Sequence, residues 1–325
     1  MKRILAAGSL ALLASGALAQ TTSTGSGQAY PARPIRILVG FAPGGAADIT
    51  ARILGEKYTG SMGVNVVVDN RTGATGIIAT DIVAKSAPDG YTLGLFALSF
   101  AINPSIRKLP YDTVRDFTPI TITATVPLVL VVTNSLTARS VKELIDMAKA
   151  KPNGLSVASS GIGSSPHLTA ELFQLMTGTK MQNIAYKGST QAHPDLIGGQ
   201  VHLMFDTIVS TTPLIKAGRL RALGVTSKNR AAEFPDVPAI NESVPGYESS
   251  SWGVLIAPAK VSPAIIEKLN KETVRALHLP DVKEKMARLG AEVVGNTTAE
   301  ARKFLNDEVE KWAKTVKAAG ITAEQ

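Results

Sequence analysis

The sequence predicts an α/β fold whose mostly parallel sheet is covered by helices and divided between two lobes. Short apolar runs typical of buried strands alternate with helix-like segments from Pro34 to the end of the chain, and Gly or Pro marks most junctions. Two β-prone segments, Ile120–Thr133 and Ser249–Ala257, break this rhythm. A strand that is too long for one sheet can continue into another lobe, so these segments are predicted to cross between the lobes.

Each expected element follows from this alternation. Strands are expected at Ile35–Phe41, Val64–Val68, Thr92–Leu95, Leu155–Ala158, Ile184–Tyr186, Val201–Phe205 and Arg221–Val225. Helices are expected between them, at Ala46–Tyr58, Ile77–Ser86, Val141–Lys151, Pro166–Thr177 and Pro213–Ala217. In the C-terminal part, Ser262 and Pro263 supply an N-cap and a first-turn proline for a helix that starts near Ala264. The last expected elements are helices at Asp281–Leu289 and Ala299–Ala319 around a short strand, Glu292–Val294.

The two crossings make the first predicted lobe discontinuous. It comprises residues 30–125 together with 250–325, and the second lobe comprises residues 126–249. The alternative organisation is one continuous doubly wound domain. A chain of 325 residues that is 45% hydrophobic is long enough for either arrangement.

The first residues have the pattern of a secretory signal peptide, residues 1–19. Lys2 and Arg3 form the charged start, Ile4–Leu13 is a short apolar core, and Ala17 to Ala19 has the A-x-A form of a cleavage site. The alternative is a buried N-terminal helix. Residues 20–29 are rich in Thr, Ser and Gly and are expected to form a flexible leader. We therefore expect an exported, periplasmic protein.

Composition and charge exclude several other classes of protein. The chain has 0 Cys, so its stability must come from apolar cores rather than disulfides. The formal net charge is +8, which becomes 8 − 2 = +6 without Lys2 and Arg3. The basic residues are scattered rather than interleaved with aromatics, which make up only 5% of the chain. This pattern favours a solvated basic surface over nucleic-acid binding.

The segment from Ile37 to Asp48 predicts an anion-binding loop. An apolar run ends in the pair Gly44 and Gly45, and a helix pattern starts directly afterwards. Such a loop presents free backbone N–H groups at the positive end of a helix dipole. Neither the P-loop pattern nor G-x-G-x-x-G occurs here, so the anion is not obviously a nucleotide phosphate.

A second loop of the same kind is expected in the other lobe. The strand Leu155–Ala158 is followed by a run of Ser and Gly that ends in Ser165 as N-cap and Pro166 as first helical residue. Hydroxyl groups and a helix N-terminus suit carboxylate or phosphate oxygens, although an ordinary capped turn is the alternative. At the same sheet edge Lys187 is a candidate to neutralise an anion, and Asp206 either accepts a ligand hydrogen bond or caps the next turn.

The sequence motifs for a catalytic or metal-binding site are weak. None of the four histidines, His167, His193, His202 and His278, forms a recognisable metal motif with another residue. His167 lies at a predicted helix N-terminus, which favours the neutral ring and a hydrogen-bonding role. The G-x-S-x-G pattern is missing around Ser160, which leaves a Ser164–His167 hydrolase as a remote alternative. We expect neither an enzyme nor a bound metal or cofactor.

Ordered motifs along the chain resemble one protein family. In the first half they are Tyr-Pro-x-Arg-Pro-Ile from Tyr30, Phe-x-Pro-Gly-Gly-x-x-Asp from Phe41, Ala-Pro-Asp-Gly-Tyr-Thr-Leu from Ala87, Leu-Pro-Tyr-Asp from Leu109 and Asp-Phe-Thr-Pro-Ile from Asp116. In the second half they are Ser-Ser-Gly-x-Gly-Ser-Ser-x-His-Leu from Ser159, Tyr-Lys-Gly from Tyr186, Asp-Leu-Ile-Gly-Gly-Gln-Val from Asp195, Met-Phe-Asp from Met204, Ile-Lys-Ala-Gly from Ile215 and Phe-Pro-Asp-Val-Pro from Phe234. With these motifs the chain resembles the Bug family of tripartite tricarboxylate transporter substrate-binding proteins, which are TctC-like.

The resemblance implies a two-lobed periplasmic binding protein fold, type II-like, whose two crossing strands form a hinge. Members of the family trap carboxylated small molecules between the lobes through loop backbone groups and ordered water. Carried over to this sequence, lobe 1 would contribute Phe41, Gly44, Gly45 and Asp48, although Asp48 is alternatively a brace of the loop. Lobe 2 would contribute Ser160, Ser164, His167 and Asp206, with Tyr186 as a weaker candidate.

Two departures from the family pattern bear on the ligand. Ile77 stands where the family usually has Asn, and Phe100, next to Ser99, stands where it often has His. If both side chains line the cleft, they make it less polar and favour an aromatic mono- or dicarboxylate, for example terephthalate. The alternative is that both only pack the core of lobe 1. The candidate ligand-binding set is Phe41, Gly44, Gly45, Asp48, Ile77, Ser99, Phe100, Ser160, Ser164, His167, Tyr186 and Asp206.

The resemblance further implies that a monomer closes on its ligand and delivers it to membrane components of a tripartite tricarboxylate-type transporter. Closure follows because the ligand contacts both lobes only in the closed state. The main alternative is a protein that presents its bound ligand to a periplasmic sensor domain in signalling.

Overall fold

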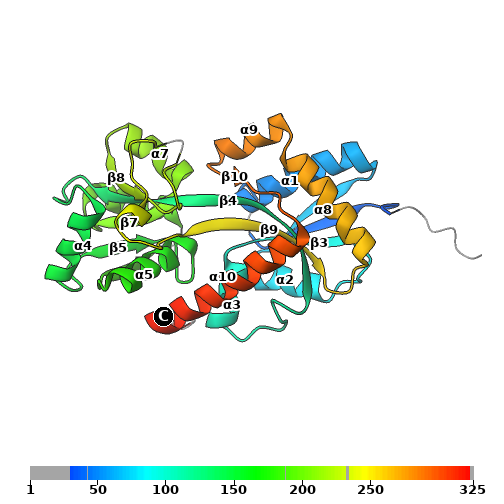
Figure 1. Cartoon of the computed structure of the whole chain (residues 1–325), viewed down its shortest axis with the longest axis horizontal. Helices are drawn as coiled ribbons and strands as arrows, with labels where there is room; N and C mark the ends of the chain where they lie inside the picture. Colours follow the sequence, from blue (N-terminus) through cyan, green and yellow to red (C-terminus); the bar gives the residue numbers. More distant parts are fainter. Residues whose placement is uncertain (1–29, 42, 187, 232–233, 323–325) are drawn as a thin grey trace, which may run out of the picture.

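A mixed ten-stranded sheet runs through the whole molecule, with helices on both of its faces (Figure 1). The computed structural model describes residues 30–41, 43–186, 188–231 and 234–322. The predicted signal peptide and leader therefore lie outside the described residues. Along the main path of the sheet the strand order is β2-β1-β3-β9-β4-β7-β5-β6, and β8 and β10 pair with β4 beside this path.

Lobe 1 is the part of the molecule built around parallel strands β1, β2 and β3. β1 (Ile35–Val39) lies between β2 (Val66–Asn70) and β3 (Thr92–Ala97) and is parallel to both. The helices that follow these strands are α1 (Ala46–Met62), α2 (Ile77–Ala84) and α3 (Ser99–Ile106), with a short 3-10 turn at Ala74–Gly76. The C-terminal elements of this lobe are α8 (Pro263–Leu277), α9 (Pro280–Arg288), β10 (Glu292–Val293) and α10 (Thr298–Ala319).

Lobe 2 repeats the parallel arrangement in the middle of the chain. β5 (Ser156–Ser159) is parallel to both β6 (Gln182–Ala185) and β7 (Leu203–Thr207). Its other elements are α4 (Val141–Ala150), α5 (Ser165–Thr177), α6 (Ser189–Gly198), α7 (Ile208–Lys216), β8 (Leu220–Val225) and a 3-10 turn at Ile240–Glu242. Because helices follow the carboxyl ends of parallel strands in both lobes, the N-termini of α1 and α5 come directly after strand ends.

Two long antiparallel strands join the lobes. β4 (Phe117–Thr133) pairs with β9 (Ser250–Pro258) from Phe117 opposite Pro258 to Pro127 opposite Ser250, with two register shifts. β4 continues into lobe 2, where it pairs with β7 and β8. Figure 1 shows β4 and β9 side by side between the lobes. The predicted fold class is confirmed, but the sheet is mixed rather than mostly parallel, because the pairs along β4 and β9 are antiparallel.

The apolar cores differ between the two faces of the sheet. On the face covered by α10, one buried cluster continues from Phe96 and Phe117 in lobe 1 through Trp252 to Phe173 and Phe205 in lobe 2. On the other face the clusters are separate: one includes α1 and α8, a small one includes α9, and one in lobe 2 includes α6 and α7. The lobes are therefore joined by a common core on one face only.

Three helices differ from the sequence prediction. α3 and α6 were not expected, and both contain a proline, Pro104 and Pro194. α7 starts at Ile208 rather than near Pro213, because the Thr207 side chain caps it by accepting from the N–H of Ser210. Across the described part of the chain, no helix is both long and apolar enough to cross a membrane.

Candidate functional site

The Gly-Gly loop of lobe 1 connects β1 to the first turn of α1. Gly44 has a φ of +87°, which favours glycine, and Gly45 is the extended N-cap residue of α1. The carbonyl oxygen of Phe41 accepts a hydrogen bond from Asn70 Nδ2 at 3.0 Å, which ties this loop to the end of β2. The structure thus places Phe41, Gly44 and Gly45 at one helix N-terminus, as the sequence predicts for an anion-binding loop.

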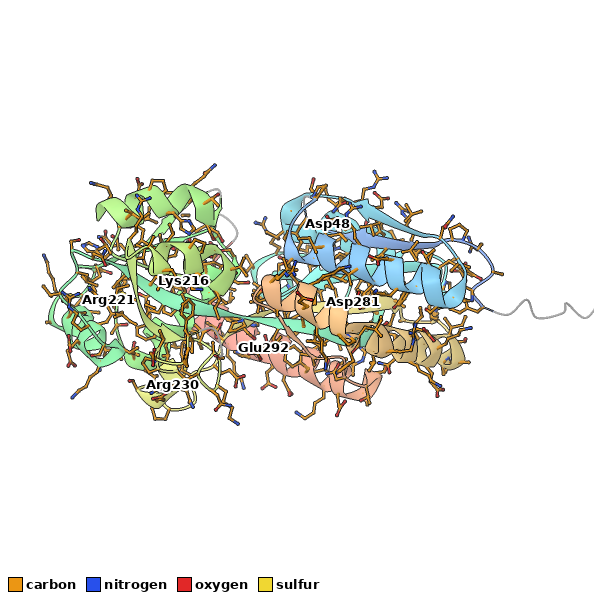
Figure 2. The ribbon with its side chains drawn as sticks, turned by 90° about the horizontal axis from the view of Figure 1, so that it is seen from above. Asp48, Lys216, Arg221, Arg230, Asp281 and Glu292 are labelled. Atoms are coloured by element: carbon orange, nitrogen blue, oxygen red, sulfur yellow. The ribbon has the colours of Figure 1, made fainter. Side chains whose placement is uncertain are left out.

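Asp48 braces this loop from within α1. Its side chain is 2% exposed, and its carboxylate accepts hydrogen bonds from Gly44 N at 2.9 Å and from two Arg52 nitrogens at 2.9 and 3.0 Å. The Arg52 guanidinium, helped by the Gly44 N–H, lowers the pKa of Asp48 below its ordinary value. Figure 2 shows Asp48 in lobe 1, near the end of α1 that faces the other lobe. Because these donors occupy its carboxylate, Asp48 shapes the loop instead of presenting a free charge.

A second loop, residues 73–76, lies beside the Gly-Gly loop and has a strained backbone. Gly73, Ala74, Thr75 and Gly76 all have positive φ, and a Cβ added to Gly40 would lie 2.6 Å from Gly76 Cα. Buried Asn103 of α3 holds the loop, since it receives a hydrogen bond from Thr75 Oγ1 at 2.9 Å and donates one to the Thr75 carbonyl at 3.2 Å. Consecutive left-handed residues outside glycine cost energy and persist only where surrounding contacts hold them.

Ile77, Ser99 and Phe100 follow this loop and the end of β3. Ile77 begins α2 and is partly buried, and Ser99 begins α3 and is partly exposed. Phe100 is 2% exposed, and its ring stacks on Phe96 and meets Phe117 edge-on at 5.4 Å between ring centroids. The Phe100 ring is therefore enclosed by the lobe 1 core, which corresponds to the second of the two alternatives that the sequence left open.

The Ser-rich loop of lobe 2 connects β5 to α5. Ser164 is the N-cap of α5, and its hydroxyl accepts from the His167 N–H. Gly161 and Gly163 have φ values of +124° and +77°, so the loop needs glycine at both positions. Ser160 and Ser164 are partly exposed, which leaves both hydroxyl groups near the surface of the loop.

His167 stabilises this loop as a neutral ring. Its Nδ1 accepts a hydrogen bond from Gly163 N at 3.1 Å, and the side chain is 4% exposed. Burial lowers the pKa of His167 to about 4, so the ring carries no charge near pH 7. The nearby Glu171 has its pKa raised by burial. The predicted neutral, hydrogen-bonding histidine is therefore found, although its partner is the loop backbone.

Asp206 connects three parts of lobe 2 at the end of β7. It is 1% exposed and accepts hydrogen bonds from Ser189 Oγ, His193 Nε2, Thr207 N and Ser210 Oγ at 2.7–2.8 Å. These donors belong to the first two turns of α6, the first turn of α7 and the strand end. Asp206 thus fixes two further helix N-termini at the carboxyl edge of the sheet.

Tyr186 is committed to a contact inside lobe 2. Its hydroxyl donates to Asp195 Oδ2 at 2.7 Å, and burial together with Asp195 raises the pKa of Tyr186 to about 12. Its backbone N–H donates to the Ser159 carbonyl. Lys187, which the sequence offers as a cation for an anion, lies outside the described residues.

An apolar cavity of about 50 Å³ lies between the start of α1 and the part of the sheet formed by β3 and the two crossing strands. It is lined by Ala46, Ala47, Thr50, Leu95, Ala97, Thr123, Ala124, Val126, Ser251, Trp252, Gly253, Met286, Leu289 and Ala291. Sequence reasoning missed these residues, because only the pairing of β4 with β9 brings them to α1. The one local signal is the pair of small residues, Ala46 and Ala47, directly after the Gly-Gly loop.

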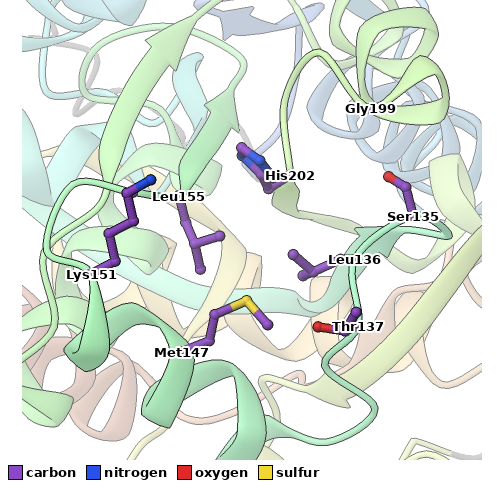
Figure 3. Close-up of a pocket in the computed structure, with 9 residues that line it drawn as sticks. Ser135, Leu136, Thr137, Met147, Lys151, Leu155, Gly199 and His202 are labelled. Carbon is purple, nitrogen blue, oxygen red and sulfur yellow. The ribbon is translucent and has the colours of Figure 1, made fainter.

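Figure 3 shows a second cavity, which lies in lobe 2. It has a volume of about 340 Å³ and is lined by Ser135, Leu136, Thr137, Met147, Lys151, Gly154, Leu155, Gly199 and His202. These residues follow β4, lie at the ends of α4 and α6, or precede β5 and β7, so the cavity is at the opposite ends of β5 and β7 from the Ser-rich loop. None of the predicted ligand-binding residues lines it. Within the described ranges, no cluster of three or more His, Cys, Asp or Glu side chains could hold a metal ion.

Comparison with known proteins gives one consistent family. Residues 50–321 match the family model described as "Tripartite tricarboxylate transporter family receptor". "Protein BugT" of Bordetella pertussis is 41% identical over 302 residues, covering 91% of this chain and 92% of that protein.

Solved structures share the fold over most of both chains. "R. palustris Rpa4515 with adipate" has a TM-score of 0.77 at 36% identity and covers 90% of this chain and 99% of that one. "Structure of periplasmic binding protein BugD" has a TM-score of 0.74 at 36% identity, with coverage of 90% and 99%. "MatC (Rpa3494) from Rhodopseudomonas palustris with bound malate" has a TM-score of 0.73 at 28% identity, with coverage of 88% and 100%. With its two lobes, its crossing strands and these matches, the chain belongs to the TctC family of tripartite tricarboxylate transporter receptors.

Proposed function

We propose that this protein captures a small organic carboxylate between its lobes. The observation that carries the proposal is the pair of glycine-containing loops, one before α1 and one before α5, that each end at a helix N-terminus. Backbone N–H groups at such termini bind anions without a cationic side chain. Asp48, His167 and Asp206 stabilise the loops and do not themselves bind the anion, because each side chain is buried and already hydrogen-bonded. The adipate and malate in two structural relatives are carboxylates of the proposed class.

We propose further that the body of the ligand is largely apolar. The cavity beside Ala46 and Ala47 is lined mainly by apolar side chains, and Ile77 begins the helix that follows the neighbouring loop. An aromatic dicarboxylate such as terephthalate, or an aliphatic one such as adipate, fits this lining better than citrate does, because citrate carries polar groups along its whole length. Phe100 has no part in this proposal, since its ring is enclosed in the core.

The role in the cell follows from the family. In this proposal the protein is a periplasmic monomer whose lobes comprise residues 30–125 with 250–325 and residues 126–249. They close about Ile120–Thr133 and Ser249–Ala257, and the closed form delivers its ligand to the membrane components of a tripartite tricarboxylate-type transporter. It acts by binding and release, without chemical conversion of the ligand.

The test is calorimetric titration of the purified protein with adipate, malate, terephthalate, benzoate and citrate, supported by thermal unfolding. A compound that binds the folded state raises the melting temperature once its concentration exceeds Kd. The variant Gly44→Ala should weaken binding, because alanine disfavours the φ of +87° that shapes the loop. The matched control is Gly63→Ala, at the other end of α1, where φ is +69°. Neither added Cβ has a steric contact within 4 Å in the described part of the chain, so the two variants differ in the place of the positive φ rather than in a clash of the new methyl group.

Two outcomes would count against the proposal. If no carboxylate binds, the assignment of the ligand class fails. If Gly44→Ala and Gly63→Ala bind a carboxylate equally well, the ligand site lies away from the Gly-Gly loop. If citrate binds more strongly than terephthalate and benzoate do, the proposal that the body of the ligand is largely apolar fails.

A further inference from the structure

The two lobes contact each other beside the crossing strands through a turn that is separate from the glycine-containing loops before α1 and α5. This turn, Leu289 to Ala291, joins α9 to β10 in lobe 1. Its central residue, Gly290, approaches the first turn of α7 in lobe 2, where Ile208 and Val209 lie. Figure 1 shows α9 and α7 facing each other across the gap between the lobes. On this face of the sheet the apolar cores of the lobes are separate, so the contact is not part of a common core.

The contact is so close that a side chain at position 290 would displace Val209. A Cβ added there would lie 2.8 Å from Val209 Cγ2, 3.5 Å from Val209 N and 3.6 Å from Ile208 Cβ. The first distance is shorter than carbon atoms tolerate, whereas the other two are ordinary contacts. The φ of Gly290 is +64°, which also favours glycine. The φ value and the close approach therefore both favour glycine at position 290. The steric conflict comes almost entirely from one methyl group of Val209.

The contact lies close to the crossing strand β4, where it can influence the angle between the lobes. β10 pairs with β4 at Ala124 and Thr125, and Leu128 of the same strand pairs with Thr207, the residue that caps α7. Both sides of the contact are therefore attached to a short stretch of the crossing strand. In a hinged body, a small displacement close to the hinge opens the far end of the cleft by a larger distance. Leu289 and Ala291 also line the apolar cavity beside α1.

We propose that the contact between Gly290 and Val209 sets how far the two lobes close. The turn is a positioning element: it touches α7 and the cavity wall, and it fixes the angle at which the loops before α1 and α5 meet. An added side chain at position 290 acts as a wedge and holds the lobes apart. The effect on ligand affinity rests on the function proposed above, whereas the effect on the distance between the lobes does not.

The experiment measures that distance directly by pulsed electron paramagnetic resonance. The chain has 0 Cys, so two introduced cysteines are the only labelling sites. Gly60→Cys in α1 and Gly198→Cys in α6 suit the labels, because both residues are exposed and an added Cβ would meet no described atom within 4 Å. Both lie on the face where the cores are separate. In this background Gly290→Ala should shift the distance distribution to longer values without any ligand.

Two further variants separate a wedge from backbone strain. Gly218→Ala, after α7, introduces alanine at a φ of +65° with no described atom within 4 Å of the new Cβ, and it should leave the distances unchanged. Gly290→Ala combined with Val209→Ala removes the methyl groups that the wedge meets, and it should restore the original distances. Titration with adipate and terephthalate should show several-fold weaker binding to Gly290→Ala and recovery in the double variant.

The inference is overturned if Gly290→Ala leaves the distance distribution unchanged, or if the double variant stays as displaced as the single one. If neither adipate nor terephthalate binds the unsubstituted protein, the proposed ligand class fails, and the distances still decide the role of Gly290.

Discussion

Trp252 and Trp312 donate their indole N–H groups to the same oxygen atom, Oε2 of Glu308, at 2.7 and 2.8 Å. Trp252 lies on the crossing strand β9, whereas Trp312 and Glu308 lie on α10. Lys311 approaches the other carboxylate oxygen at 3.2 Å. Glu308 is 8% exposed, so this buried carboxylate joins the C-terminal helix to a strand that runs between the lobes.

Removing this carboxylate should destabilise the protein strongly. In Glu308→Ala two buried indole N–H groups lose their acceptor, and each such loss costs about 1–3 kcal/mol. We expect the free energy of unfolding to fall by about 3 kcal/mol in total. Urea unfolding followed by tryptophan fluorescence measures this directly, because the chain has 2 Trp and both are in the cluster. The control Glu310→Ala removes an exposed partner of Lys314 and should change stability by less than about 0.5 kcal/mol. Equal stability of the two variants would contradict the assigned role of Glu308.

Stability should fall as the pH drops from about 6.5 to about 4, through His167. The ordinary pKa is 6.5 and burial lowers the pKa of His167 to about 4, so in this window the unfolded chain binds a proton that the folded protein does not. Stability therefore rises with pH across the window and is fully present above 6.5. A difference of this size corresponds to about 3 kcal/mol.

The measurement is urea unfolding at several pH values, together with NMR titration of the histidine rings. His167→Asn should flatten the stability profile, since asparagine can accept from Gly163 N but does not titrate. His278→Asn, which replaces an exposed histidine, should leave the His167 contribution in place. If the His167 ring titrates near 6.5 in the folded protein, it does not stabilise the loop before α5 as a neutral ring.

Asp48 should matter more for the shape of the Gly-Gly loop than for its charge. Asp48→Asn keeps an oxygen that can accept from Gly44 N, whereas Asp48→Ala leaves that N–H and the Arg52 side chain without the partner they have now. We expect Asp48→Ala to cost about 1–3 kcal/mol of stability and to weaken carboxylate binding, with smaller effects in Asp48→Asn. The ion pair itself adds little, because the Arg52 side chain is 54% exposed. Calorimetric titration with adipate distinguishes the variants, and a larger loss in Asp48→Asn than in Asp48→Ala would be inconsistent with a bracing role.

Asp206 should control the order of two helix starts at once. In Asp206→Asn one of the two acceptor oxygens becomes an NH₂ group, which then faces the donors of that oxygen: Ser189 and the Thr207 N–H at one position, or His193 and Ser210 at the other. We expect a loss of about 2–4 kcal/mol and faster amide hydrogen exchange at residues 188–190 and 207–210. Ser210→Ala removes one donor only and should cost about 1 kcal/mol. If exchange accelerates only near 207–210, Asp206 does not link α6 to α7.

The lobed architecture was predictable because its signals are local. Two β-prone runs longer than their neighbours indicated the crossing strands, and glycine before a helix pattern indicated the loops before α1 and α5. The start of β4 was missed, since Pro119 reads as a strand boundary. In the structure Pro119 lies at a register shift between β4 and β9, where a missing N–H is tolerated.

Other features depend on contacts that sequence patterns do not contain. Ile208 and Val209 are β-branched and have a low helix propensity, yet the Thr207 cap starts α7 there, ahead of the start that the sequence predicts at Pro213. Phe100 reads as a candidate cleft residue, but the position of Phe96 and Phe117 places its ring in the core. The bracing roles of Asp48 and Asp206 likewise require partners that only the tertiary structure identifies, such as His193 for Asp206.

The antiparallel pairing of β3 and β4 with β9 has a consequence for how the chain acquires its structure as it is synthesised. β9 begins at Ser250, so the sheet of lobe 1 stays incomplete until more than three quarters of the chain exists. β5, β6, β7 and β8 find their partners among residues 117–225, which emerge earlier. Lobe 2 can therefore form while β3 still has an open edge, whereas the sheet of lobe 1 is completed only once β9, in the last quarter of the sequence, is available.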